Sequence, residues 1–414
     1  MYKPEIIQWQ DDVTQARGWL VIDKLINGVC GGGIFMHDSA TEREVKELAQ
    51  AMSYKNTLQK IPFGGAKAGI RYDHTKADAK DVLARFLNFL KPWLETVWCT
   101  GADLNTTNQA IHKVIDQMGL PSMFDALGRM IAHKLEIENQ SRDIFSRMMT
   151  AMTKYFTLSE GATGYSVAQV IAEMFNHKTP RIFIQGFGTV GRSLAYYVQQ
   201  WNIGKVVGIC DADGAIYDEN GIDCIEILES CSVSMKKVGI DCYLSDHLKR
   251  KYNFNQRDQN KNDEAYFIEA LSKINIDVLS PCAHRYSITE AIVDSIVEAN
   301  QTISIIAGSN NIFDSDKTRE VAIKRGIQCI PEWISNCGNA ILYEELLAIE
   351  QMPINPKSHF QHLIRANILS FIKECQLEKY PPEHRYAAFV HTANRRMEAA
   401  DKIIYKNQFA NLVA

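Results

Sequence analysis

The stretch GFGTVG, residues 186–191, constrains the possible folds of this chain more than any other sequence feature. It follows an apolar run, RIFIQ, that predicts a strand, and it opens a helical run, VGRSLAYYVQQW. In such a strand–turn–helix unit the first glycine makes the tight turn, the second lets the backbone approach a pyrophosphate, and the third allows close packing of helix and strand. We therefore predict an α/β domain with a dinucleotide site formed by Gly186, Gly188, Thr189, Val190 and Gly191.

A carboxylate stands where such a site needs one. The second apolar run, KVVGIC, ends on Asp211, 20 residues after Gly191. An acid at this spacing accepts hydrogen bonds from the adenosine ribose hydroxyls and repels a 2′-phosphate, so the pattern favours NAD over NADP. The helix N-terminus would hold the pyrophosphate through its unpaired N–H groups. A domain of this class that binds another ligand, or none, is the alternative.

Three segments follow from the distribution of apolar runs. Residues 1–150 mix strand-like runs (GWLVIDKLI, VCGGGIFM) with a helical period over 41–58. Residues 151–340 alternate short apolar runs with helical segments, which is typical of a parallel sheet. Residues 341–414 have the pattern of long helices, and the polar stretch 247–264 is expected to be an exposed excursion from the middle segment.

Composition excludes several classes of function. With 45 Lys and Arg against 49 Asp and Glu, the net charge is −4, and no basic block suggests nucleic-acid binding. No apolar run is long enough to span a bilayer, and the first residues lack the order of a secretory signal. The ten cysteines occur singly, without the spacing of a zinc site. We expect a cytoplasmic protein with reduced thiols, no metal, no membrane partner and no nucleic acid.

Two lysines and one aspartate precede the dinucleotide motif. Lys67 stands among glycines and alanines in PFGGAKAGI, so a substrate or a backbone could come very near its ammonium group. Asp103, in TGADLNT, is a candidate proton-exchanging partner, or an ordinary turn aspartate. Lys55 lies near the apolar face of the helical stretch, and a lysine that lays its stem on apolar surface is the alternative there. Together with the dinucleotide motif, the three suggest polar groups that face a nicotinamide ring.

These residues belong to a longer series of segments that resembles the glutamate/leucine/phenylalanine/valine dehydrogenase superfamily. The segments are, in order, MSYKNTL, PFGGAKAGI, TGADLNT, GATGYSV, QGFGTVG, DADGAIYD, DVLSPCA, IIAGSNN and PEWISNCGNA. The resemblance covers most of the chain and implies oxidative deamination of an L-amino acid to a 2-oxo acid and ammonia, with hydride transfer to nicotinamide. It also implies a first domain for substrate binding and oligomerisation, a Rossmann-type second domain, C-terminal helices that pack back on the first domain, and a homo-oligomer.

The resemblance assigns a role to each motif residue. It makes Lys67 the catalytic lysine that activates water and polarises the carbonyl, and Asp103 the carboxylate that exchanges protons near the amino group. It makes Lys55 the residue that binds the substrate α-carboxylate. The other substrate-binding residues that it implies are Gly32, Asn336 and Tyr343. The other cofactor-binding residues are Thr163, Ala283 and Asn310.

The side-chain pocket departs from the glutamate branch. Glutamate enzymes of the superfamily carry a K-G-G-x-R stretch, and here Gly31 stands at the lysine position and Phe35 at the arginine position. A buried side-chain carboxylate without a cation would be heavily penalised. Tyr343, where glutamate enzymes tend to have serine, would shrink the pocket or change its polarity. We therefore expect a neutral or apolar substrate of the leucine, valine or phenylalanine kind.

Two other functions stay open at this point. The length of 414 residues is closer to that of a glutamate enzyme, so a glutamate dehydrogenase with a non-standard side-chain anchor is possible. A non-catalytic homologue that binds a nucleotide or an amino acid is the other, because Thr189 and Asn339 depart from the pattern near the cofactor and the cleft. The joint presence of Lys55, Lys67 and Asp103 argues against a non-catalytic protein.

Overall fold

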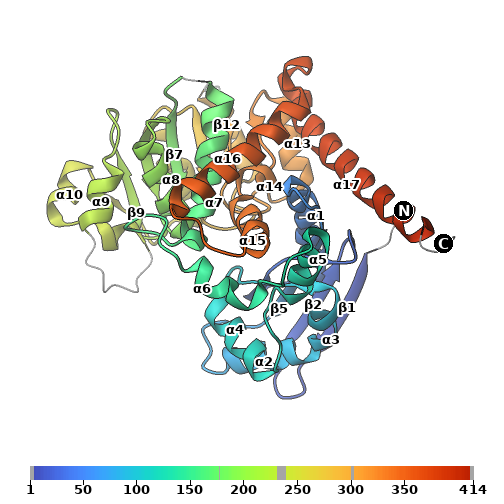
Figure 1. Ribbon diagram of the computed structural model, residues 1–414. Coiled ribbons are helices and arrows are strands. Elements are labelled where there is room, and N and C mark those ends of the chain that lie inside the picture. The colour runs from blue at the N-terminus through green and yellow to red at the C-terminus, as the bar shows by residue number, and fades with distance from the viewer. Residues whose placement is uncertain (1–3, 177, 231–238, 300–302, 411–414) are drawn as a thin grey trace. The chain divides into compact units, whose positions relative to one another are not determined.

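The chain forms two compact units, each with its own sheet (Figure 1). The computed structural model describes residues 4–176, 178–230, 239–299 and 303–410, with side chains as far as residue 400. Unit 1 comprises Met1–Met149, Ala340–Ile354 and Val390–Ala414, and unit 2 comprises Thr150–Asn339 and Asn355–Phe389. The expected C-terminal segment, 341–414, is therefore divided between the units, because residues 355–389 belong to unit 2 rather than to the first domain.

The sheet of unit 1 is mixed. Its order is β1-β2-β5-β3-β6, and β4 pairs with β5 as well. The pairs β1–β2 and β2–β5 are antiparallel, whereas β3 and β4 both run parallel to β5. The run VCGGGIFM thus gives two short strands in place of one, because the chain leaves the ladder at residues 32–33. The strands are β1 (Glu5–Gln10), β2 (Arg17–Ile22), β3 (Cys30–Gly31), β4 (Ile34–His37), β5 (Gly64–Arg71) and β6 (Trp98–Cys99).

Helix α1 (Glu42–Lys55) covers one face of this sheet. It begins where the side chain of Thr41 accepts a hydrogen bond from the N–H of Glu44, an N-cap that the sequence favours. Val45, Leu48 and Ala49, which recur at helical spacing, pack in one buried cluster with Val21 and Phe35. The other helices of this part are α2 (Ala79–Phe89), α3 (Lys91–Thr96), α4 (Asn108–Gln117), α5 (Asp125–Leu135) and α6 (Ile144–Met148).

Unit 2 contains a seven-stranded sheet whose centre is parallel. Its order is β10-β9-β8-β7-β11-β12-β13. The pairs β7–β8, β7–β11, β11–β12 and β12–β13 are parallel, and β9 and β10 add an antiparallel edge. The strands are β7 (Arg181–Gln185), β8 (Lys205–Cys210), β9 (Gly214–Tyr217), β10 (Asn255–Gln256), β11 (Val278–Pro281), β12 (Ser304–Ile305) and β13 (Gln328–Cys329). The polar stretch 247–264 thus includes an edge strand.

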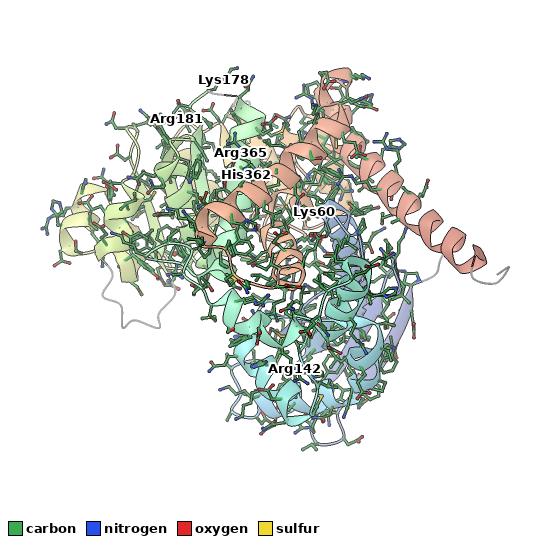
Figure 2. The ribbon with its side chains drawn as sticks, in the orientation of Figure 1. Lys60, Arg142, Lys178, Arg181, His362 and Arg365 are labelled. Atoms are coloured by element: carbon green, nitrogen blue, oxygen red, sulfur yellow. The ribbon has the colours of Figure 1, made fainter. Side chains whose placement is uncertain are left out.

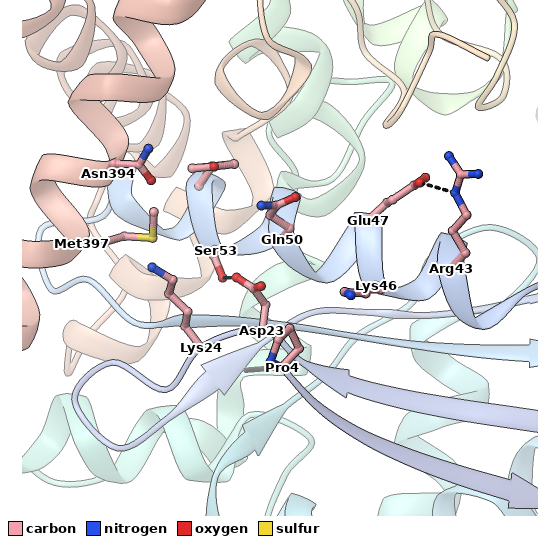
Figure 3. Close-up of a pocket in the computed structure, with 11 residues that line it drawn as sticks. Pro4, Asp23, Lys24, Arg43, Lys46, Glu47, Gln50, Ser53, Asn394 and Met397 are labelled. Carbon is pink, nitrogen blue, oxygen red and sulfur yellow. Dashed lines mark hydrogen bonds and ion pairs between the residues drawn. The ribbon is translucent and has the colours of Figure 1, made fainter. Parts of the chain in front are cut away.

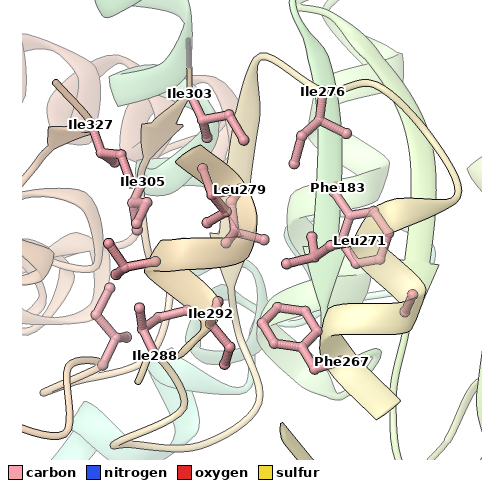
Figure 4. Packing of buried hydrophobic residues seen from close by; sticks show 14 of the residues in the cluster. Phe183, Phe267, Leu271, Ile276, Leu279, Ile288, Ile292, Ile303, Ile305 and Ile327 are labelled. Atoms are coloured by element: carbon pink, nitrogen blue, oxygen red, sulfur yellow. The ribbon is translucent and has the colours of Figure 1, made fainter. Parts of the chain in front are cut away.

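The hydrophobic core of unit 2 lies between this sheet and three helices (Figure 4). Phe183 of β7 and Leu279 of β11 pack against Phe267, Ile292 and their neighbours. The next residue of β7, Ile184, faces the opposite side of the sheet, as strand alternation requires, and lies beside Gly191. The helices that follow the strands are α8 (Thr189–Gln200), α9 (Cys224–Ser230), α10 (Asp246–Lys251), α11 (Asp263–Ser272), α12 (Glu290–Glu298), α13 (Asp316–Lys324) and α14 (Glu332–Ser335).

Helices also complete unit 2 before and after this sheet. Helix α7 (Leu158–Phe175) begins at a capping box formed by Thr157 and Glu160. Helix α16 (Pro356–Cys375) contributes Phe371, whose ring centroid lies 5.7 Å from that of Trp333, so aromatic packing explains why α16 belongs to unit 2. Two further helices, α15 (Gly338–Ala348) and α17 (Arg385–Ala410), each begin in unit 2 and end in unit 1.

The amino ends of the central strands of unit 2 are held by one arginine. Arg181, labelled in Figure 2, begins β7, and its side chain forms an ion pair with Glu219. Its backbone N–H donates to Asp277 Oδ2 at 2.8 Å, and its Nε donates to the carbonyl of Asn275 at 2.8 Å. This end of the sheet is therefore occupied by structural contacts, which leaves the carboxyl ends of the strands for a ligand. Across the described ranges, we find no helix with the length and apolar character needed to cross a membrane.

Candidate active site

Lys67 and Asp103 form an ion pair in unit 1. Lys67 lies on β5 opposite Val21 of β2, and its side chain is only 4% exposed. Asp103 follows Ala102, which bridges Ile34 at the start of β4, a parallel neighbour of β5. The sheet therefore brings together two residues that are 36 positions apart in the sequence.

The turn around Asp103 holds its carboxylate in place. Asp103 Oδ1 accepts a hydrogen bond from the N–H of Leu104 at 2.8 Å, and the N–H of Thr106 donates to the carbonyl of Asp103 at 3.0 Å. Burial alone would raise the pKa of Asp103, but the charge and hydrogen bond of Lys67 outweigh it, and the pKa is lowered. Asp103 is therefore both a turn residue and the ionised partner of Lys67.

Lys55 belongs to the same electrostatic group. It ends α1, is buried with 8% of its surface exposed, and its positive charge contributes to the lowered pKa of Asp103. Lys55 is buried as a whole residue, which differs from the alternative in which only its stem lies on apolar surface and its ammonium group reaches open water. Asn56, the next residue, donates from Nδ2 to the carbonyl of Gly64 at 2.8 Å, which links the end of α1 to the start of β5.

The small residues around Lys67 serve backbone packing. A Cβ atom on Gly65 would lie 2.1 Å from the N of Ser53, and one on Gly64 would lie 1.9 Å from the carbonyl oxygen of Lys24. Helix α1 and the chain after β2 therefore occupy the space that these glycines leave. Of the two alternatives that the small residues allowed, approach of a substrate or approach of a backbone, the second holds for these two positions.

Protein atoms also fill the space at the expected side-chain anchor. A Cβ on Gly31 would lie 2.6 Å from Cys99 Sγ and 2.7 Å from Cε2 of Phe63. Gly32 is equally confined, because its Cβ would lie 1.6 Å from the carbonyl oxygen of Ala66, and its own carbonyl accepts from Trp98 Nε1 at 3.1 Å. Substrate binding by Gly32 stays a prediction. The sequence analysis missed Cys99 and Phe63, since only the strand pairing places them beside Gly31.

Tyr343 lies on α15 against an aromatic neighbour. Its ring centroid is 4.9 Å from that of Phe124. The next residue, Glu344, accepts hydrogen bonds from the backbone N–H groups of Lys60 and Ile61, and sequence reasoning gave no signal for it. Tyr343 therefore lies beside the chain that leads into β5, in the same unit as Lys67.

The predicted cofactor residues of unit 2 gather at the carboxyl ends of the parallel strands. Gly186 follows β7 with φ of +94°, and its Cβ would lie 2.7 Å from the Cα of Ala283, which follows β11. A Cβ on Gly191 would lie 1.9 Å from the carbonyl oxygen of Gly186. Gly188 is the N-cap of α8, and Thr189 and Val190 form its first turn. These glycines let the turn after β7, the start of α8 and the chain after β11 come into close backbone contact, at the point where the strand order reverses. This backbone cradle and the N–H groups at the start of α8 fit a dinucleotide pyrophosphate.

Asp211 has backbone partners of its own. It follows β8, its Oδ1 accepts from the N–H of Asp213 at 2.9 Å, and its Oδ2 accepts from the N–H of Ile240 at 2.5 Å. Burial raises the pKa of Asp211, and these two N–H groups offset that effect only in part. Each carboxylate oxygen retains a second lone pair, so the contact with a ribose stays a prediction.

The other predicted residues of unit 2 form two side-chain pairs. Asn336 Nδ2 donates to Asn310 Oδ1 at 2.8 Å, and Asn339 Nδ2 donates to Thr163 Oγ1 at 3.2 Å. Asn336, which we predicted to bind substrate, is thus joined to a predicted cofactor residue and belongs to unit 2. Asn339, which departs from the family pattern, supports Thr163 directly.

A cavity of about 460 Å³ in unit 1 is lined by none of the predicted catalytic, substrate-binding or cofactor-binding residues (Figure 3). Charged side chains line much of it, and two contacts cross its wall: Arg43 Nε donates to Glu47 Oε1 at 2.8 Å, and Ser53 Oγ donates to Asp23 Oδ2 at 2.5 Å. Its residues come from α1, α17, the chain after β2, and Pro4. It therefore has no part in the site described above.

A dinucleotide-type unit and a second unit with a buried lysine–aspartate pair are the parts of a nicotinamide-dependent oxidoreductase. The chain belongs to the glutamate/leucine/phenylalanine/valine dehydrogenase family. The family model of glutamate/leucine/phenylalanine/valine dehydrogenase matches residues 157–401, and the model of the dimerisation domain of these enzymes matches residues 4–119. The protein is thus an NAD(P)-dependent amino-acid dehydrogenase, which oxidatively deaminates an amino acid.

Three similar proteins are glutamate dehydrogenases. The glutamate dehydrogenase of Thermotoga maritima is 25% identical over 335 residues, which cover 78% of this chain and 70% of that protein. The NADP-specific glutamate dehydrogenase of Saccharolobus shibatae is 24% identical over 342 residues, covering 78% and 69% of the two chains. The NAD-specific enzyme of Staphylococcus aureus is 25% identical over 317 residues, covering 75% and 67%. The last two names show that relatives of this chain include both NADP-specific and NAD-specific enzymes.

Solved structures share the fold. The hetero-hexameric glutamate dehydrogenase of Thermus thermophilus, in a leucine-bound form, has a TM-score of 0.67 at 15% identity and covers 96% of this chain and 88% of its own. The glutamate dehydrogenase of Peptoniphilus asaccharolyticus has a TM-score of 0.60 at 20% identity, covering 97% and 91%. The two-domain α/β architecture predicted from the sequence is confirmed.

Proposed function

We propose that this protein catalyses the NAD-dependent, reversible oxidative deamination of an L-amino acid with a neutral, apolar side chain of the leucine, valine or phenylalanine kind. One observation carries the proposal for the substrate: the Gly31 position holds no cation, and the uncharged Cys99 and Phe63 fill the space beside it. A carboxylate buried there would lose its hydration without gaining a charged partner. An apolar side chain suffers no such loss.

The lysines and the aspartate of unit 1 can perform the steps on the substrate. Lys55 binds the α-carboxylate of the amino acid through its positive charge. Asp103, which Lys67 keeps ionised, accepts a proton from the α-amino group, and the hydrogen on Cα leaves as hydride, which converts the amine into an imine. Lys67 then activates a water molecule that attacks the imino carbon. Collapse of that adduct breaks the carbon–nitrogen bond and releases ammonia, with the proton returned through Asp103. In the reverse direction, Lys67 polarises the carbonyl of the 2-oxo acid.

The carboxyl ends of the strands in unit 2 would hold the cofactor. When bound, the nicotinamide dinucleotide supplies a hydride acceptor for the hydrogen on the substrate Cα. The N-terminus of α8 would offer N–H groups to the pyrophosphate, and Thr163 and Asn310 would approach the nicotinamide end. Asp211 puts a negative charge after β8, which supports NAD rather than NADP. We expect a kcat/KM for NADH at least about tenfold above that for NADPH, and an equal or better rate with NADPH would contradict this.

Glutamate is the second candidate, because the named relatives described above are glutamate dehydrogenases. In that case the γ-carboxylate needs an anchor other than residue 31. A non-catalytic homologue is a weaker candidate. Burial of the Lys67–Asp103 pair costs stability, and only an active enzyme would use the pair for proton transfer.

A panel of 2-oxo acids decides among these candidates. Purified protein receives NADH and ammonia with branched-chain, aromatic, short-chain and dicarboxylic 2-oxo acids, and NADH oxidation is followed. We expect the fastest turnover with an apolar oxo acid and its loss in Lys67→Ala, whereas Lys80→Ala, at an exposed lysine of α2, retains it. A best rate with 2-oxoglutarate would favour glutamate, and silence with every oxo acid would favour the non-catalytic protein.

We also propose that the protein is a homo-oligomer that assembles through unit 1. The match of residues 4–119 to the family's dimerisation domain supports this. Light scattering coupled to size exclusion measures the mass directly, and the mass of a single chain, 46.9 kDa, at micromolar concentration would contradict the proposal.

A further inference from the structure

A buried carboxylate in unit 1 has no role in the chemistry proposed above. Glu344 lies on α15 and is only 5% exposed. Its Oε1 accepts a hydrogen bond from the N–H of Ile61 at 2.7 Å, and its Oε2 accepts one from the N–H of Lys60 at 3.1 Å. Buried carboxylates need such donors, since an unpartnered charge in the interior is costly.

The backbone that Glu344 holds leads directly into the active site. Phe63, whose ring lies beside Gly31, comes two residues after Ile61, and β5 with Lys67 follows at once. A displacement of residues 60–61 would therefore move both the wall of the side-chain pocket and the catalytic lysine. Each hydrogen bond of Glu344 acts on a peptide at the start of this run.

The helix that carries Glu344 is held at its other end as well. The guanidinium group of Arg147, on α6, donates from Nη1 to the carbonyls of Leu346 at 2.8 Å and Ile349 at 2.7 Å. Leu346 lies in the last turn of α15 and Ile349 directly follows the helix, so the arginine satisfies carbonyls that the end of the helix leaves without a helical partner. Arg147 therefore holds the C-terminal end of α15, the helix that carries Tyr343. The residue after Tyr343 is Glu344, whose carboxylate binds the backbone of residues 60–61.

We propose that Glu344 is a positioning residue whose carboxylate links α15, the helix of Tyr343, to the backbone that places Phe63 and Lys67. The proposal rests on the proposed function, because Lys67 and the side-chain pocket matter only in an amino-acid dehydrogenase. Glu344 touches neither substrate nor cofactor in this scheme. It acts through the residues that it holds.

The link depends on the ionisation of Glu344. Burial raises the pKa of Glu344 to about 7, and the N–H groups of Ile61 and Lys60 lower it only in part. The charged groups around it are the side chain of Lys60, which favours the ionised form, and Glu345, which disfavours it. Arg147 of α6 and Arg396 of α17 bind backbone carbonyls of this region. The ionised carboxylate accepts from both N–H groups with full strength, whereas in a neutral carboxyl one oxygen is an O–H and a weaker acceptor, so one of the two hydrogen bonds is weakened.

Amide hydrogen exchange of the full chain tests the link without any turnover. Protection factors of the Lys60 and Ile61 amides are measured from about pH 5.5 to about pH 8.5 in three proteins. We expect protection in the wild type to rise about tenfold across this range, as one further charge-assisted bond forms. Glu344→Gln, which resembles the neutral form at every pH, should show low, pH-independent protection. Glu350→Gln, the same change at an exposed glutamate that follows α15, should behave like the wild type.

Steady-state kinetics with the accepted 2-oxo acid give the functional measure. The kcat/KM of Glu344→Gln relative to wild type should be near one at about pH 6 and fall to about one-tenth at about pH 8, with the KM for NADH unchanged. A loss that is the same at every pH would mean a merely structural role and would overturn the proposal. The proposal would also be overturned if the Lys60 and Ile61 amides of Glu344→Gln were as strongly protected as those of the wild type. If Glu344→Gln does not fold, the pH dependence of exchange in the wild type decides, and flat protection overturns the proposal. If the protein turns over no oxo acid, the proposed function is wrong. The exchange experiment still tests the positioning role of Glu344 in that case, because it requires no turnover.

Discussion

The ammonium group of Lys67 and the carboxylate of Asp103 form an ion pair in which the lysine side chain is almost fully buried. Lys67 comes from the middle of β5, and Asp103 from the turn that follows the bridge between Ile34 and Ala102. The pair therefore joins two segments of unit 1 and places a proton donor beside a proton acceptor. Removal of either partner leaves the other as an uncompensated charge.

Asp103→Asn should destabilise the protein as well as inactivate it. We expect a loss of about 2–3 kcal/mol in the free energy of unfolding, less than for a fully buried pair because the Asp103 side chain is 24% exposed. The double variant Lys67→Met/Asp103→Asn should regain most of that stability and stay inactive, since neither charge is then left alone. Urea unfolding at neutral pH measures both, and wild-type stability of the single variant would contradict the burial argument.

Gly31→Ala tests whether the anchor position is filled. The new Cβ would lie 2.6 Å from Cys99 Sγ, so we expect overpacking to cost about 1–3 kcal/mol. Adding Cys99→Ala should recover part of the loss, because it removes the atom in conflict. Gly31→Lys should confer no activity with 2-oxoglutarate while Cys99 and Phe63 are present. Thermal unfolding and the oxo-acid assay check these outcomes, and a stable Gly31→Lys variant that uses 2-oxoglutarate would refute the filled-pocket argument.

Gly191→Ala should abolish NADH binding. Its Cβ would lie 1.9 Å from the carbonyl oxygen of Gly186, so the turn after β7 and the first turn of α8 must separate. Gly326→Ala is the matched control in unit 2, because no atom lies within 4 Å of its Cβ and only its φ of +88° is unfavourable. NADH fluorescence titration should show binding lost in the first variant and unchanged in the second, and tight binding by Gly191→Ala would be inconsistent with the cradle.

Stability should depend on pH through Glu344. Burial raises the pKa of Glu344 in the folded state to about 7, above the ordinary glutamate value of 4.5, so the folded state holds this proton more tightly than the unfolded state. The contribution to stability is therefore full below about pH 4.5 and is lost as the pH rises through about 7, by about 3 kcal/mol. The difference between wild type and Glu344→Gln, measured by urea unfolding at several pH values, isolates this effect. Glu350→Gln, at an exposed glutamate, is the control, and a stability difference between wild type and Glu344→Gln that does not vary with pH would exclude the proposed effect of Glu344.

The sequence predicted those parts of the site whose geometry is local. The turn of Gly186 and Gly191 lies within one strand–turn–helix unit, so the spacing of the glycines was enough to place it after β7 and at the start of α8. The same holds for Asp211, which directly follows an apolar strand. Lys67 and Asp103 were paired by family resemblance and chemistry, and strand pairing then brought them together.

Other features depend on segments that meet only in the folded chain. The glycines beside Lys67 looked like open space, but α1 and the chain after β2 occupy the sites of their missing side chains. Glu344 gave no signal, because its partners at residues 60–61 are more than 280 positions away in the sequence. The helices after residue 340 were expected to return together to the first domain, but the aromatic contact of Phe371 with Trp333 keeps α16 in unit 2.

The sequence by itself determined the class of fold and the dinucleotide motif. It also singled out Lys55, Lys67 and Asp103 as the candidate charged residues of the site. Those inferences rest on short-range spacing, which backbone geometry converts directly into strands, turns and helix starts. Only the tertiary structure decided what fills the space beside Gly31, which backbone Glu344 holds, and where the C-terminal helices belong. Packing is set by atoms from distant segments that must fit the same volume, and no local pattern specifies which of them will meet.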